Sequence, residues 1–136
     1  MRYRVAAPIQ LALLLLSCTD HEIPPSPAIA YVTGFVTADS GTVEGAAVVV
    51  DAGGFALGCP AISGGTIGQA QASAAGAYTA TALLATQADS VCVTVYATPP
   101  TGSTLRRSAS LILLVSFRHS PPFDTTHADL HLAPPL

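Results

Sequence analysis

Short runs in which apolar and polar residues alternate fill most of the chain from Ile29 onward. The clearest run covers 91–97, where Val or Ala at every second position predicts one inward face and places Cys92, Thr94 and Tyr96 on the other. Gly, Pro, Ser and Asp separate these runs, as expected for turns between strands. Further candidate strands lie at 29–38, 46–51, 55–59, 66–73, 76–82, 105–117 and 126–132.

No run has the helical period of apolar residues, and no helix pattern alternates with the strands. The chain has 136 residues, which gives room for one domain. We therefore expect an all-β fold, an antiparallel sandwich of seven or eight strands, over residues 29–136.

The amino terminus has the pattern of an export signal. Two arginines precede an apolar stretch over 5–16, which Pro8 interrupts. Because crossing the hydrocarbon core takes roughly twenty apolar residues, this stretch is too short for a membrane span and predicts a signal peptide over 1–17. The three prolines at 24, 25 and 27 then predict a short extended stalk over 18–28.

The signal segment ends in Leu15-Leu16-Ser17-Cys18, which resembles the lipobox of bacterial lipoproteins. The resemblance implies that Cys18 carries lipid, becomes the new amino terminus and anchors the domain to a membrane. Thr19, in place of Asp, implies the outer membrane of the cell envelope. The alternative is an ordinary secretory signal with a chance cysteine.

With Cys18 assigned to lipid, Cys59 and Cys92 are the remaining cysteines. An exported compartment is oxidising, so we expect a disulfide between them, on an outer face because Cys92 alternates away from the valines. The alternative is two buried free thiols. Neither cysteine has the C-x-x-C spacing of redox or zinc sites.

Several short motifs resemble the carboxypeptidase regulatory-like domain, a transthyretin-type β-sandwich related in architecture to the immunoglobulin fold. These motifs are Gly34-Phe-Val36, Ser40-Gly-Thr-Val-Glu-Gly-Ala46, Ala75-Gly-Ala-Tyr78 and Val91-Cys-Val-Thr-Val95. The resemblance covers roughly 30–132 and implies a non-catalytic module. The Gly-rich stretch 52–74 departs from the family pattern.

The stretch 111–115 is apolar without a break, although a half-buried strand should alternate. If Leu113 and Val115 face the core, then Ile112 and Leu114 stand on the opposite face. Either a loop or a bulge removes them from solvent, or they form an apolar patch that meets a partner or a second copy of the chain.

His127, Asp129 and His131 share one face of the last candidate strand and are the only metal-ligand types that cluster there. The apolar residues between them explain the same pattern as ordinary alternation. We therefore expect no metal and no other cofactor.

Composition narrows the function classes. The net charge is -3, and Arg106-Arg107 is the only basic pair of the expected domain, so a nucleic-acid partner is excluded. No Gly-x-Ser-x-Gly elbow presents a nucleophile, and we expect no enzyme. The favoured function is a lipid-anchored envelope module that binds or spaces a protein or glycan partner.

The alternative function is a carbohydrate-binding accessory module. The chain has no Trp, and Tyr31, Phe35, Tyr78 and Tyr96 lie in candidate strands where packing is the expected role.

Overall fold

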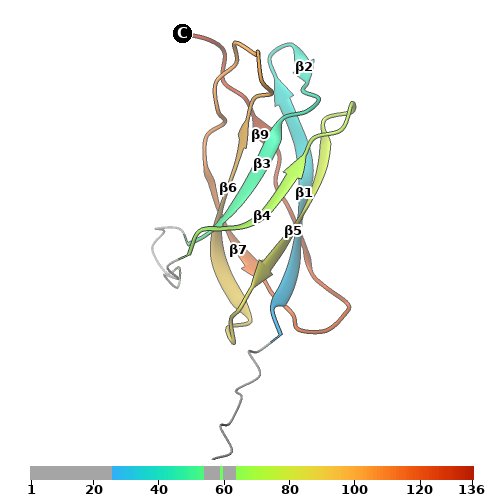
Figure 1. Ribbon diagram of the computed structural model, residues 1–136, viewed down its shortest axis with the longest axis vertical. Coiled ribbons are helices and arrows are strands. Elements are labelled where there is room, and N and C mark those ends of the chain that lie inside the picture. The colour runs from blue at the N-terminus through green and yellow to red at the C-terminus, as the bar shows by residue number, and fades with distance from the viewer. Residues whose placement is uncertain (1–25, 54–58, 60–63) are drawn as a thin grey trace, which may run out of the picture.

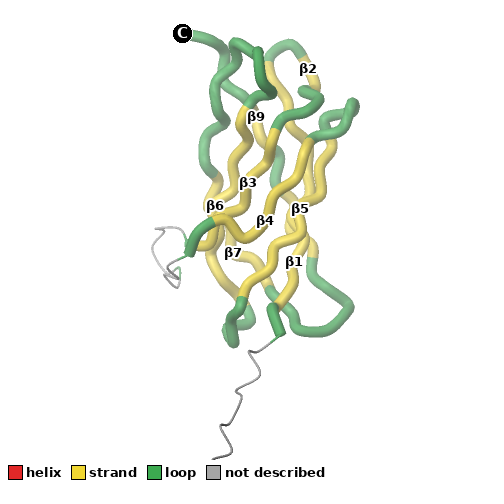
Figure 2. Tube along the Cα trace, in the orientation of Figure 1, coloured by secondary structure: helices red, strands yellow, loops and turns green. Residues whose placement is uncertain are grey.

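The computed structural model describes residues 26–53, 59 and 64–136. These residues form strands and loops without a helix (Figures 1 and 2). The strands are β1 (Ala28–Ala38), β2 (Gly41–Thr42), β3 (Ala47–Ala52), β4 (Thr66–Gln71), β5 (Ala77–Leu84), β6 (Ser90–Thr98), β7 (Leu111–Ser116), β8 (Thr125–His127) and β9 (Leu130–His131).

Two sheets make up the molecule, and their strands run along its long axis (Figure 1). In the first sheet, β1 pairs with β5 and β2 along one edge and with β8 and β9 along the other. The second sheet has the order β4-β3-β6-β7, and all of its pairs are antiparallel. β7 is therefore an edge strand.

Alternation along the strands builds the core between the sheets. In β6, Val91, Val93 and Val95 are fully buried, and the inward residues of β1 and β3 are buried in the same way. Because successive side chains of a strand point to opposite faces, the sequence pattern places this core directly. The predicted all-β sandwich is confirmed.

The carboxyl-terminal part differs from the predicted single strand over 126–132. It forms two short strands, β8 and β9, and both pair in parallel with β1 instead of antiparallel. The chain between them passes over Gly34, where an added Cβ atom would lie 1.9 Å from the carbonyl oxygen of Ala128. Gly34 is therefore required for this close approach.

The entry to β1 is held by side-chain contacts. Both ring nitrogens of His119 lie at hydrogen-bond distance from carbonyl oxygens, that of Ser26 at 2.9 Å and that of Thr86 at 3.0 Å. The backbone of Ile29 also exchanges hydrogen bonds with Arg118. These contacts fix the end of the domain from which the amino-terminal segment leaves.

Several predictions lie outside the described residues. They are the signal peptide over 1–17, the lipid site Cys18, the stalk up to residue 25 and most of the candidate strand at 55–59. Within the part of the chain that the structure describes, no helix is long and apolar enough to cross a membrane.

Candidate functional site

The outer face of β6 and β7 carries most of the residues that the sequence singles out. The N–H of Gly53 donates to the carbonyl of Cys92, so the even-numbered residues of β6 bond toward β3. The N–H of Phe117 donates to the carbonyl of Asp89, so the odd-numbered residues of both strands bond between β6 and β7. The side chains of the even-numbered residues point away from the core.

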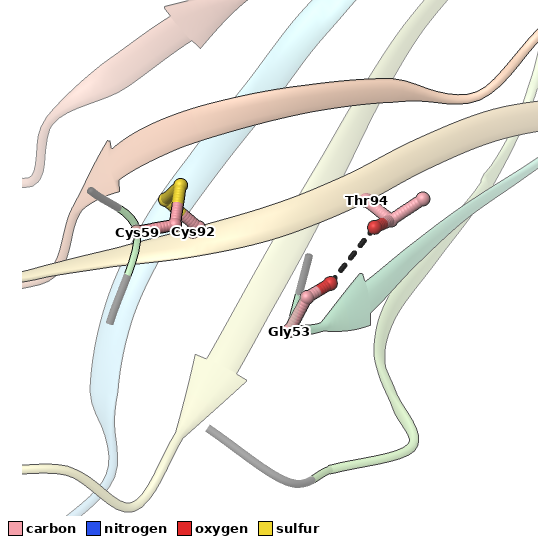
Figure 3. Close-up of a disulfide and its surroundings, with 4 residues drawn as sticks. All are labelled: Gly53, Cys59, Cys92 and Thr94. Carbon is pink, nitrogen blue, oxygen red and sulfur yellow. Dashed lines mark hydrogen bonds between the residues drawn. A yellow bond between two sulfur atoms is a disulfide. The ribbon is translucent and has the colours of Figure 1, made fainter. Parts of the chain in front are cut away.

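The disulfide between Cys59 and Cys92 is present, with the two Cα atoms 5.6 Å apart (Figure 3). Cys92 lies on the outer face, as predicted, because its neighbours Val91 and Val93 fill the core. It is nevertheless only 1% exposed. Two free thiols are excluded, and the bond joins the segment around Cys59 to β6.

Thr94 provides a second link near the disulfide. Its hydroxyl donates to the carbonyl of Gly53 at 2.8 Å, where the chain leaves β3 (Figure 3). The connection from β3 to β4 is thus tied to β6 at two described residues, at Gly53 by this hydrogen bond and at Cys59 by the disulfide.

Ile112 and Leu114 have the predicted parity. Leu114 lies directly opposite Cys92, and Ile112 lies opposite Thr94. The inward Val115 and Phe117 are buried, but Ile112 is 41% and Leu114 is 62% exposed. Among the described residues, no bulge changes this parity and no loop buries the two side chains, contrary to the first of the two sequence-based explanations.

A polar contact borders these two side chains. The guanidinium of Arg107 lies 3.5 Å from the centre of the Tyr96 ring, and it donates to the hydroxyl of Ser110 at 2.9 Å. A cation over an aromatic face is an attractive pair that also covers the ring. Tyr96 is therefore occupied by packing, and the sequence pattern did not reveal this partner.

The outer edge of β7 has no described pairing strand. Since the odd-numbered residues of β7 bond to β6, the backbone N–H and C=O groups of Ile112, Leu114 and Ser116 point away from the sheet. The residues with exposed apolar side chains thus also offer unpaired backbone groups among the described residues. An edge of this kind can accept another strand.

The three carboxyl-terminal candidates lie on one exposed face but form two separate groups. The ring of His127 contacts Asp129 at 2.9 Å. The ring of His131 contacts Asp39 at 3.0 Å and the hydroxyl of Thr37 at 3.2 Å. Within the described ranges, no three His, Cys, Asp or Glu side chains are arranged to hold a metal ion.

Asp129 has a structural role at the turn between β8 and β9. Its carboxylate accepts a hydrogen bond from the backbone N–H of Phe35 at 2.9 Å. This bond, followed by the contact with His127, lowers the pKa of Asp129. The side chain thereby takes the place of a strand carbonyl where the pairing of β1 changes from β8 to β9.

Aromatic residues divide into buried and exposed groups. Tyr78 is buried, as expected for packing, but Phe35 is 46% exposed on the outer face of the first sheet. Nearby on the same sheet, Tyr31 makes an edge-to-face contact with Phe123, with ring centres 6.1 Å apart. The parity of Phe35, opposite to that of Val32 and Val36, is the signal that could have identified its exposure.

A recess of about 340 Å³ lies at the end of β7, and its lining is polar. Arg118 and Asp124 form an ion pair there at 2.9 Å, and Ser90 and Ser116 lie 3.4 Å apart. Because Arg118 and Asp124 are both about half exposed, solvent screens their ion pair.

No protein-family model matches this sequence, and a search of curated proteins finds no significant relative.

Proposed function

We propose that this chain is a non-catalytic, lipid-anchored module of a bacterial cell envelope, held at the outer membrane, that binds or spaces another surface component. The observation that carries the binding role is the exposure of Ile112 and Leu114 on an edge strand. Neighbouring apolar side chains that remain exposed on one strand favour an interaction surface.

Other features support the anchored and exported part of the proposal. The lipobox-like Leu15-Leu16-Ser17-Cys18 precedes a Pro-rich segment, and β1 begins at Ala28, soon after that segment ends. The Cys59–Cys92 disulfide is the kind of bond that persists in an oxidising compartment. We also propose that the sandwich is of the carboxypeptidase regulatory-like, transthyretin type, on the motifs given above.

The double change Ile112→Thr and Leu114→Thr tests the binding role. The full chain is purified from detergent-solubilised envelopes. The amount of the envelope component that co-purifies with it should fall about tenfold or more in the double variant. The free energy of unfolding, measured by thermal denaturation, should fall by about 1 kcal/mol or less, because exposed strand positions accept Thr.

Leu83→Thr is the matched control, since Leu83 is 48% exposed on the other sheet. This variant should retain the component. The binding role is wrong if the double variant retains the component as wild type does. It is also wrong if the double variant loses as much stability as a core variant, because both side chains would then belong to the core.

A carbohydrate-binding accessory module is the second candidate. Phe35 favours it, because exposed aromatic rings are suited to stack against sugar rings and this ring is 46% exposed. Purified full-length protein on a glycan array should then bind a defined set of glycans and lose them in Phe35→Ala. Binding that survives Phe35→Ala, or no binding at all, would exclude this face as a sugar site.

A further inference from the structure

The segment 110–116 is chemically nearly symmetrical about its centre. It has the sequence Ser-Leu-Ile-Leu-Leu-Val-Ser, so that Ser110 matches Ser116, Leu111 matches Val115 and Ile112 matches Leu114 around Leu113. In a two-fold symmetric contact between identical strands, each residue meets its partner on the other side of the axis. A strand with this sequence is therefore complementary to an antiparallel copy of itself.

The backbone of β7 fits the same symmetry. A two-fold axis at Leu113 places Ile112 of one copy opposite Leu114 of the other, and both residues direct their N–H and C=O groups to the open edge. Each such pair can exchange hydrogen bonds in both directions. The sequence symmetry and the direction of the free backbone groups thus favour one register.

We propose that β7 pairs antiparallel with β7 of a second copy of this chain, with Ile112 opposite Leu114 across a two-fold axis at Leu113. The inference names the component bound at the β6–β7 edge, and it rests on that part of the proposed function.

The side chains support this occupant on both faces of the sheet. On the outer face, the pairing brings the exposed Ile112 and Leu114 of both copies side by side. On the inner face, Leu111 and Leu113 pack against the core but stay half-buried, and the added strand extends their cover.

Charge also permits the pairing. No ionisable side chain lies between Arg107 and Arg118, so the axis brings no like charges together within the strand. The β7 edge therefore lacks the charged side chains that, on other sheet edges, oppose the addition of another strand.

Sedimentation velocity of the full chain in detergent, over a range of concentrations, tests the proposal. Wild type should show a reversible dimer. Leu114→Pro should raise the dimer dissociation constant about tenfold or more, because proline removes the outward N–H and blocks the added strand. Since that N–H bonds to no described residue, the variant should keep the wild-type far-ultraviolet circular dichroism spectrum.

Leu83→Thr on the other sheet is the matched control and should dimerise as wild type does. A wild-type chain that stays monomeric at every concentration overturns the proposal, and so does a folded Leu114→Pro chain that dimerises normally.

A charge exchange tests the register without proline. Ile112→Glu and Leu114→Lys should each dimerise poorly alone, and an equimolar mixture should recover a heterodimer, because the two new charges face each other across the axis. No recovery on mixing overturns this register.

A monomeric wild type that still captures an envelope component through Ile112 and Leu114 would refute self-pairing and leave the proposed function standing. A wild-type chain that dimerises but carries no lipid at Cys18 would refute the proposed membrane anchoring and leave self-pairing standing.

Discussion

Tyr78 joins the core to the crossing between β8 and β9. Its ring is buried, and its hydroxyl donates to the carbonyl of Ala128 at 2.5 Å. Burial, reinforced by the negative charge of Asp129, raises the pKa of Tyr78 well above its ordinary value, so the hydroxyl stays a donor at every physiological pH.

Tyr78→Phe should lower the free energy of unfolding by about 1 to 3 kcal/mol, because it leaves the carbonyl of Ala128 without its hydrogen-bond donor. Urea unfolding followed by fluorescence measures the change. Tyr31→Phe is the control, because Tyr31 is only half-buried and should lose little. Equal stability of Tyr78→Phe and wild type would show that the hydroxyl bond contributes nothing.

Asp129 links stability to pH. Its folded-state pKa is lowered, first by the N–H of Phe35 and then by His127, so the carboxylate stabilises the fold above its unfolded pKa of about 3.9. This contribution is lost as the pH falls through the lowered folded value. Asp129→Asn should therefore melt below wild type at neutral pH, and the two melting temperatures should converge in acid.

Glu44→Gln provides the control for this pH series, since Glu44 is exposed and makes no described side-chain contact. Its melting temperature should follow that of wild type across the series. If the difference between Asp129→Asn and wild type persists unchanged into acid, the charge of Asp129 is not the source of the stabilisation.

At the scale of elements, the disulfide ties the connection after β3 to β6. The bond closes a separation of 33 residues, for which loop closure predicts a contribution of about 3 to 4 kcal/mol. Cys59→Ala with Cys92→Ala should lower the unfolding free energy by a similar amount. Denatured, unreduced wild-type protein should show no reactive thiol at these positions, and two reactive thiols would contradict the structure.

Alternation in the sequence predicted which side chains of a strand face the core far better than it predicted which strands pair with each other. In β6 the period of two assigned Val93 to the core and Thr94 to the outside, because backbone geometry alone fixes that choice. The parallel pairing of β8 and β9 with β1 was missed, since it depends on the passage of Ala128 over Gly34. A contact between residues so distant in sequence leaves no local periodic signal.

The candidate site shows the same division. Parity identified Ile112 and Leu114 as outward-facing, but exposure depends on whether another segment covers them, which the sequence left open. Cys92 illustrates the opposite case, because an outward position is buried there. The stacking of Arg107 on Tyr96 was also missed, since the loop that carries Arg107 has no regular pattern.

At the scale of the whole molecule, the strands run along the long axis, and the start of β1 and the carboxyl terminus lie at opposite ends of the sandwich (Figure 1). An antiparallel pair of β7 strands therefore places the starts of the two β1 strands at opposite ends of the pair. Two copies anchored in one membrane would pair with their long axes along the membrane plane.

The lipid at Cys18 is the prediction on which this orientation depends. Mass spectrometry of the mature wild-type chain should find acyl groups on an amino-terminal Cys18, and the chain should partition into detergent. Cys18→Ser should remain unprocessed or become soluble, because no other residue of the motif accepts the lipid. Ser17→Ala is the control, since a small residue before the cysteine preserves the motif, and it should be processed normally. An unmodified amino terminus at another position in wild type would show that the chain is exported without an anchor.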